Sequence, residues 1–427
     1  MAPQHTGKRP FYGWRNVVIC FICYCMVYGV VFYGFSVVFP AMVKAMAWKR
    51  GDASIAHTIR ALLVAFGSPL CGYMIGRWGV RATLLSGGVL IIAGMTLAGT
   101  VMTELWQWTI LWGVVVGLGL SLCGVIGVQT NVTNWFNKNR GMAMGIVLTG
   151  AALGGFVAQP LFTWIMKQFG QWQVGWIAGA VFSLIGVVVV IWLKNKPEDY
   201  GQYQDGISPE EAKATASEGP KKAKTLTYRT PVPWTLSEAV RTRQLWFLIY
   251  AVLMQIFPLY FLTTHGVFHM TGHGLTAMQA AYVLSFNVLG GAIARFPMGW
   301  LADRIEGRWL LTFCYVLIVS SMYVFWQAPS MTSLAVAATI FGFSYGAGFV
   351  LVPILVGSYF GAKNFHKIVS FMFPIEYGLG SLVPVGAGYI YDYTKSYDLF
   401  FMVMLTLIAV CIVCAFLTTP PQKKAKA

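Results

Sequence analysis

Long apolar runs separated by short polar segments divide this chain from one end to the other. A helix needs about 20 predominantly apolar residues to cross a bilayer, and runs of that length recur through both halves of the sequence. The expected spans are 14–39, 54–76, 82–102, 108–132, 141–166 and 172–193, followed by 243–268, 279–301, 308–327, 332–357, 367–391 and 397–418. The pattern therefore predicts an all-α integral membrane protein with twelve transmembrane helices.

The longest polar stretch lies between the sixth and the seventh run. Residues 194–242 are rich in Lys, Glu, Pro, Ser and Thr, a composition that buries too little apolar surface to fold alone. We expect a six-helix bundle over 1–193, a cytoplasmic solvated linker over 194–242, and a second bundle with a short basic tail over 243–427. Thr235 or Ser237 would cap a short helix at the membrane surface, just before the seventh span.

Composition agrees with this picture, and the distribution of charge gives it an orientation. The chain is 57% hydrophobic and only 10% charged, whereas soluble domains carry about 25% charged residues. The net charge of +16 does not call for a nucleic-acid partner, because the basic residues lie in short segments between apolar runs. Most of the 30 lysines and arginines fall on the side of the termini and the linker, which predicts a multi-pass protein of the cytoplasmic (inner) cell membrane with cytoplasmic termini.

Two loop motifs occur twice. Gly72–Arg81 (GYMIGRWGVR) follows the second span, and Gly299–Arg308 (GWLADRIEGR) follows the eighth, 227 residues later. The segment Trp135–Arg140 (WFNKNR) is repeated as Tyr359–Asn364 (YFGAKN), 224 residues on. Two unrelated motifs repeated at nearly one offset predict two pseudo-symmetric six-helix bundles.

With these repeated halves and the G-x-x-x-D-R-x-x-G-R motif at Gly299–Arg308, the chain resembles the major facilitator superfamily. The resemblance implies that charged residues of the motif hold the cytoplasmic ends of neighbouring helices together. The latch residues that it implies are Asp303, Arg304 and Arg308 in the second copy, and Arg77 and Arg81 in the first. Gly76 stands where the first copy needs its acid, so the N-terminal latch is expected to be weaker or to be made by other residues.

Within that superfamily, an ordered series of segments is similar to the monocarboxylate transporters and the bacterial oxalate/formate antiporters. The segments are FYGWRNVVICF, SVVFPAMVKAMAWKRGDASIA, WFNKNRGMAMGIVLTGAALGG, ARFPMG and YFGAKNFHKI. The resemblance implies that Arg295 binds the substrate carboxylate. Gly34 and Gly291 replace a lysine and an aspartate of the animal carriers, and Glu376 falls near a lysine of the antiporters. Neither the proton chemistry of the carriers nor the two-cation site of the antiporters is therefore carried over.

Three charged residues lie well inside expected spans: Arg60, Arg295 and Glu376. A charge at the bilayer centre costs about 2.5–3.5 kcal/mol or more and marks a functional site by default. The planar fork of Arg295 suits a carboxylate, although it could instead bond to carbonyls freed by Pro297. Glu376 is a candidate proton carrier or a permanent partner of Arg60, and Arg60 is a candidate gate or second anion site.

Other polar residues within the spans are candidates for the substrate cavity, although each could equally serve packing. They are Tyr28, Tyr33, Gln129, Asn131, Thr149, Asn287 and Tyr345. His265, His269 and His273 recur every four residues, but Gly272 and Gly274 should end their helix, so we expect no metal site. His265 is instead a candidate pH-sensitive gate.

No P-loop, H-E-x-x-H or Ser–His–Asp pattern stands in a plausible context, so we expect neither an enzyme nor a cofactor. The sequence predicts a secondary active transporter of small organic anions that works by alternating access. The expected substrates are monocarboxylates such as lactate or pyruvate, with protons as the coupling ion. One alternative is an oxalate/formate-type antiporter, and another is a transport-inactive membrane sensor or scaffold.

Overall fold

The computed structural model describes residues 10–136, 140–206, 228–230, 232, 234–302, 304–328, 330–361 and 364–422. Within these residues the chain consists of helices and connecting loops, without a β-strand.

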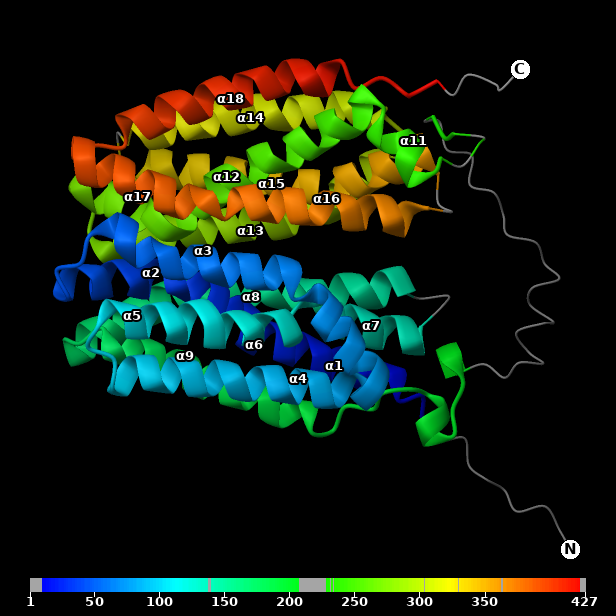
Figure 1. Cartoon of the computed structure of the whole chain (residues 1–427), viewed down its shortest axis with the longest axis horizontal. Coiled ribbons are helices and arrows are strands. Elements are labelled where there is room, and N and C mark those ends of the chain that lie inside the picture. The colour runs from blue at the N-terminus through cyan, green and yellow to red at the C-terminus, as the bar shows by residue number, and fades with distance from the viewer. Residues whose placement is uncertain are drawn as a thin grey trace, which may run out of the picture.

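Helices α1 to α9 form the first group in Figure 1. Short π-helical segments lie within the first and fourth expected spans, so several labelled elements belong to one continuous helix. The elements are α1 (Gly13–Cys23), η1 (Tyr24–Gly29), α2 (Val30–Ala45), α3 (Arg50–Phe66), α4 (Ser68–Thr100), α5 (Leu105–Trp108), η2 (Thr109–Val116), α6 (Gly117–Leu122), α7 (Val125–Trp135), α8 (Arg140–Phe169) and α9 (Gln173–Val190).

Helices α12 to α18 form the second group. The elements from the linker onward are η3 (Glu198–Tyr200), η4 (Gln204–Gly206), α11 (Leu236–Val240), α12 (Arg243–Gly272), α13 (Ala277–Ala302), α14 (Gly307–Gln327), α15 (Met331–Phe360), α16 (Phe365–Gly380), α17 (Leu382–Thr394) and α18 (Asp398–Phe416). As expected, Thr235 caps α11, and its side chain accepts a hydrogen bond from the Glu238 amide. Helix α12 carries His265 and His269 and ends at Gly272, as expected, and His273 is its C-cap.

Eleven helices in the described part of the chain are long and apolar enough to cross a membrane. The second and third expected spans are divided differently from the prediction, because α3 ends at Phe66 and the chain continues from Ser68 into α4. The backbone of α4 is non-helical at Gly79 (φ 82°, ψ 168°), in the left-handed region that favours glycine. The boundary expected between the two spans therefore falls inside α4.

The two groups lie side by side with their helices running in the same general direction (Figure 1). Contacts between them are made chiefly by α8 with α13, α3 with α17 and α2 with α12. The beginning of α1 and the end of α18 lie at the same end of the groups, which we name the terminal end. We name the other end the opposite end.

Each group has its own packed interior. In the first, Trp108, Trp112 and Trp176 cluster around Phe35, with the Trp112 and Phe35 rings 4.8 Å apart. In the second, the packing of α13 against α15 depends on glycines. A side chain at Gly290 or Gly346 would collide with the facing backbone, so these small residues let the two helices approach closely.

The sequence predicted a solvated linker from residue 194 onward. In the structure, the first part of this segment instead stays in contact with the helices. The Tyr12 amide donates to Gln202 Oε1 at 2.9 Å, and Gln204 Nε2 donates to the Thr133 carbonyl at 3.2 Å. Residues 194–206 therefore pack against the first group. On the other side, the Thr230 amide donates to the Ser358 carbonyl at 2.8 Å, which attaches the end of the linker to the second group. Residues 207–227 lie outside the described part.

Candidate substrate cavity between the two groups of helices

A cavity of about 170 Å³ lies between the two groups, with walls from both. Aromatic side chains make up much of its lining, and it contains two cations, Arg60 and Arg295. Four other residues expected in the site also line it: Tyr28, Tyr33, Gln129 and Tyr345. No carboxylate is among the lining residues of the described chain, so both cations face the cavity without an acid beside them.

Arg295 projects from α13 toward the first group of helices. Its Nη1 donates to the Leu148 carbonyl of α8 at 3.5 Å, and its guanidinium carbon lies 5.4 Å from the centre of the Phe349 ring. Its Nε is buried and has no hydrogen-bond partner. Leu148 is on another helix and is not the residue whose carbonyl Pro297 leaves free. The donors of Arg295 are thus only weakly used, which leaves them open to an anion.

Arg60 lies on α3 at the facing wall and bonds to His57, which was not among the predicted site residues. Its Nη2 lies 3.1 Å from His57 Nε2, one turn earlier on the same helix, and its guanidinium lies 5.2 Å from the Phe32 ring centre. Both Arg60 Nε and His57 Nδ1 are buried without a partner. His57 and Arg60 are three residues apart, a spacing that places two helical side chains on one face. This spacing could have predicted the pair.

Glu376 does not meet Arg60 in this conformation. Glu376 is on α16 and is 4% exposed, and its Oε1 has no hydrogen-bond partner. Its neighbours Phe373 and Tyr377 line the cavity, but Glu376 is not among the lining residues. The Arg60 guanidinium is directed to a histidine of its own helix, so the expected partnership is absent between these two described residues.

Three of the expected site residues lie away from the cavity. Asn131 donates from Nδ2 to the Lys194 carbonyl at 2.9 Å, and Thr149 donates to the Gly145 carbonyl of its own helix at 2.8 Å. Asn287 is 5% exposed, on the face of α13 that packs against Gly342 of α15. The sequence marks these side chains as polar, but it does not tell which helix face looks into the cavity.

At the opposite end the groups are bound together by contacts between α3 and α17. The Asp392 carboxylate accepts from the Gly51 amide at 2.8 Å and from the Arg50 amide at 3.3 Å, so it caps the first turn of α3 from the other group. The Arg50 guanidinium lies 3.5 Å from the Tyr391 ring centre. A Cβ at Gly388 would lie 2.7 Å from Gly51 Cα, which shows how closely the two helices approach.

His265 belongs to the same closed contact. Its Nε2 lies 2.8 Å from the Pro384 carbonyl, and its Nδ1 lies 3.0 Å from the Tyr397 hydroxyl. A carbonyl can only accept, so Nε2 carries a proton and donates. Arg50 Nη1 donates to the same Tyr397 hydroxyl at 2.8 Å, and this hydroxyl can donate its proton to Nδ1 of a neutral imidazole.

Toward the terminal end the cavity continues. A second cavity of about 330 Å³ shares Tyr28, Gln129 and Tyr377 with the first and extends past Ala65 and Ser370. Ala65 lies near the end of α3, and Ser370 lies near the start of α16. The route from the central cavity thus leads toward the terminal end, while the opposite end is closed.

In the two repeated loop motifs, at Gly72–Arg81 and Gly299–Arg308, the side chains of Arg77, Arg304 and Arg308 are exposed or contact near neighbours in the sequence. Arg304 lies over the Trp300 ring at 3.6 Å, Arg308 pairs with Glu306 at 3.2 Å, and Arg77 is exposed. Asp303 lies outside the described residues. In the first copy, the Arg81 amide donates to Asn195 Oδ1 at 2.8 Å. Asn195 thus binds the start of the helix after Gly79, where the motif carries Gly76 in place of an acid.

The chain is similar to known membrane transporters. A family model described as Major Facilitator Superfamily matches residues 17–384 and, in a second match, 285–427. Monocarboxylate transporter 13 of Rattus norvegicus is 27% identical over 402 residues, which cover 92% of this chain and 85% of that protein. The oxalate:formate antiporter of Oxalobacter formigenes is 24% identical over 369 residues, covering 84% and 80%.

A solved structure supports the fold independently of close sequence similarity. A bacterial homologue of the human lysosomal transporter Spinster, in an inward-facing and occupied conformation, matches with a TM-score of 0.70 at 16% identity, covering 96% of this chain and 97% of that one. The relatives are named as transporters and not as enzymes. Because the family model spans most of its length, the chain belongs to the Major Facilitator Superfamily and is a multi-pass membrane transporter related to the monocarboxylate transporters.

Proposed function

We propose that the protein is a secondary active transporter of small monocarboxylates, coupled to protons and working by alternating access. The observation that carries this proposal is Arg295, a cation with weakly used donors at a cavity whose described lining contains no acid. A guanidinium cannot lose its charge at physiological pH, and its planar fork matches a carboxylate. The names of the relatives in the comparison support the same class of substrate.

The proposal includes a topology of twelve spans in two bundles. The span beyond the eleven is α3 together with the first part of α4, up to the backbone break at Gly79. The bundles are 1–193 and 243–427, joined by 194–242. The excess of basic residues near the terminal end supports a cytoplasmic position for that end, and the proposed location is the cytoplasmic (inner) cell membrane.

On this orientation the structure is inward-facing. The contacts of Asp392 and Arg50 close the outer side, and the second cavity leads to the cytoplasm. An outward-facing state would break the outer contacts and bring the loop motifs together, with Asp303, Arg304 and Arg308 as the main latch. Arg77 and Arg81 would contribute to the latch of the first bundle.

Proton coupling is assigned to Glu376, with Arg60 and His265 in gating roles. Glu376 is buried and has one carboxyl oxygen without a partner, a costly state for an ionised group in a membrane. His265 lies at the outer contact between the bundles. A second candidate function is carboxylate exchange, which the relative named an oxalate:formate antiporter favours.

Transport by purified protein in proteoliposomes tests these functions. We expect radiolabelled lactate to accumulate when the external medium is made acidic relative to the interior. Uptake that ignores the pH gradient but needs an internal carboxylate would replace proton coupling with exchange. Absence of both gradient-driven uptake and counterflow, for lactate and for a wider panel of carboxylates, would refute the transporter proposal.

A further inference from the structure

We propose that the preferred substrate is a ring-bearing monocarboxylate of about the size of benzoate, whose ring is held between aromatic side chains of the two bundles. This inference rests on the proposed function and narrows its substrate class. It concerns the apolar part of the substrate, whereas Arg295 accounts only for the carboxylate.

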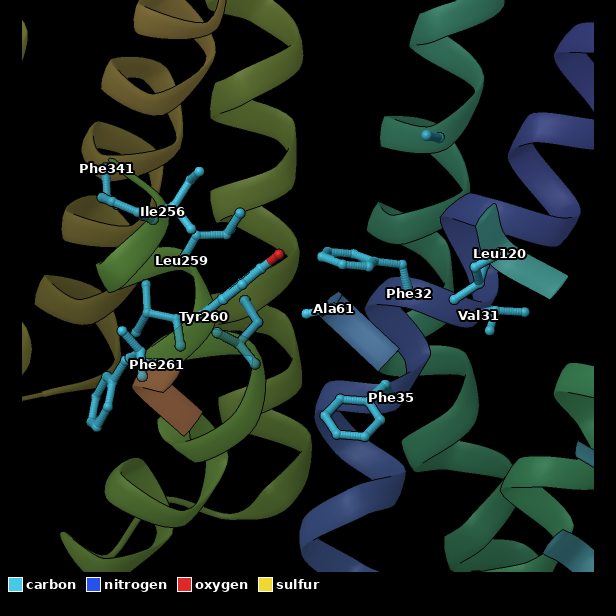
Figure 2. Close-up of a cluster of buried hydrophobic side chains, with 14 of the residues drawn as sticks. Val31, Phe32, Phe35, Ala61, Leu120, Ile256, Leu259, Tyr260, Phe261 and Phe341 are labelled. Atoms are coloured by element: carbon cyan, nitrogen blue, oxygen red, sulfur yellow. The ribbon is translucent and has the colours of Figure 1, made fainter. Parts of the chain in front are cut away.

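The cavity presents aromatic rings from both sides of the gap. Phe32 of α2 and Tyr260 of α12 project toward one another from the two bundles in Figure 2, and both line the cavity. The rings of these two described residues do not form a close pair with one another, whereas Phe32 stacks on Tyr28 at 5.6 Å and meets Tyr33 edge-on at 5.0 Å. The two tyrosines therefore fix the orientation of the Phe32 ring, and a substrate ring could pack against it.

Most polar groups of the cavity are tyrosine hydroxyls, each carried on an apolar ring. Besides the two arginines and these hydroxyls, the one polar lining side chain among the described residues is Gln129. A sugar or polyol needs many hydrogen-bond partners, because each polar group buried without one costs free energy. A carboxylate with a flat apolar body needs few partners, and its ring can make offset or edge-on contacts with the surrounding rings.

The central cavity has the size for a small ligand. Its volume of about 170 Å³ is smaller than the roughly 300–1,000 Å³ of sites for drug-sized ligands. Lactate would leave much of the aromatic wall in contact with water, whereas a single six-membered ring with one carboxylate would cover it. Since burial of apolar surface is favourable in proportion to its area, the ring-bearing acid should bind more tightly than lactate.

A panel of four compounds tests this inference on the unmodified protein. Lactate, benzoate and cyclohexanecarboxylate share the carboxylate, and benzyl alcohol keeps the ring without the charge. We expect benzoate to inhibit lactate counterflow at a concentration at least tenfold lower than unlabelled lactate does, and radiolabelled benzoate to be transported. Cyclohexanecarboxylate should inhibit less well than benzoate, because it lacks the flat ring, and benzyl alcohol should not inhibit.

Two variants connect the preference to the cavity. Phe32→Leu and Tyr260→Leu should each lower the preference for benzoate over lactate, by roughly threefold to tenfold. Phe313→Leu is the matched control, because Phe313 is 54% exposed on α14 and does not line the cavity. Size-exclusion profiles identify any variant that fails to fold, and the compound panel does not depend on the variants.

The outcomes separate this inference from the proposed function. Lactate counterflow inhibited as well by lactate as by benzoate would overturn the ring preference and leave the monocarboxylate transporter intact. Equal inhibition by benzyl alcohol would overturn the requirement for a carboxylate on the ring. Absence of counterflow with every carboxylate would overturn the proposed function, and the inference with it.

Discussion

Arg60 Nη2 lies 3.1 Å from His57 Nε2 across one turn of α3, and the two side chains form a buried pair at the wall of the cavity. A guanidinium can only donate, so His57 must be neutral and must accept at Nε2. Protonation of His57 would remove this acceptor and place two cations beside one another. The position of Arg60 thus depends on the protonation state of His57.

This dependence predicts different results for two substitutions at His57. His57→Gln retains a hydrogen-bond acceptor for Arg60 and should keep most of the lactate counterflow. His57→Ala leaves the guanidinium without that acceptor, which costs about 1–3 kcal/mol for a buried polar group, and should lower both counterflow and the melting temperature. Equal activity of the two variants would show that the hydrogen bond does not position Arg60.

Arg295→Lys tests the anchor of the carboxylate. Lysine keeps the charge but loses the planar fork of donors, so we expect lactate counterflow to fall at least tenfold while the protein still reaches the membrane. Lys167→Arg is the matched control, because Lys167 is exposed in the last turn of α8. Near-normal counterflow by Arg295→Lys would remove Arg295 from the binding site.

Glu376→Gln separates coupling from transport. Glutamine fills nearly the same space without a titratable proton, so the variant should retain counterflow but lose the stimulation of uptake by an imposed pH gradient. The measurement is the ratio of the initial rates with and without the gradient. If that ratio stays as in the unmodified protein, Glu376 does not carry the coupled proton.

The contact of Gly388 with Gly51 predicts a way to open the outer side. Gly388→Val would push α17 away from α3, because even a Cβ at this position lies 2.7 Å from Gly51 Cα. In an Ala61→Cys background, a membrane-impermeant thiol reagent added from the outside should then label the cavity faster. Gly386→Val is the matched control on the same helix, since nothing lies within 4 Å of a Cβ at Gly386. Labelling that is equally fast in both variants would show that this contact does not hold the outer side closed.

Asn195 should stabilise the first group of helices, because its side chain accepts a hydrogen bond from the Arg81 amide of the loop motif. Asn195→Ala removes the acceptor of the Arg81 amide and should cost about 1 kcal/mol, as the loss of a helix cap does. Asn195→Asp keeps the acceptor and should unfold at nearly the wild-type temperature. A common melting temperature for the two variants would argue against the cap.

The sequence predicted the parts of the fold that depend on local patterns. Apolar runs identified the helices, and Thr235 with Glu238 identified the cap of α11. The break at Gly67 and the non-helical backbone at Gly79 were not predicted, because glycines also occur inside uninterrupted helices such as α13.

The candidate site was predicted less completely, because its formation depends on the rotation of each helix about its axis. Arg60 and Arg295 stood out as charges in apolar runs, and both line the cavity. Asn131 and Asn287 are as polar as Gln129, yet Asn131 bonds to the segment after α9 and Asn287 faces α15. Phe32 and Tyr260 were not predicted as site residues, because aromatic residues are common in membrane spans. Only the packing of the two groups of helices brings these two side chains to one cavity.

Attachment of both linker ends has a consequence for the range of motion. Gln202 and Gln204 fix its beginning to the first bundle, and Thr230 fixes its end to the second. The chain between Gly206 and Tyr228 can reach roughly 70 Å when fully extended, at about 3.3–3.6 Å per residue. Any movement of the two groups that keeps both attachments must therefore keep Gly206 and Tyr228 within this distance.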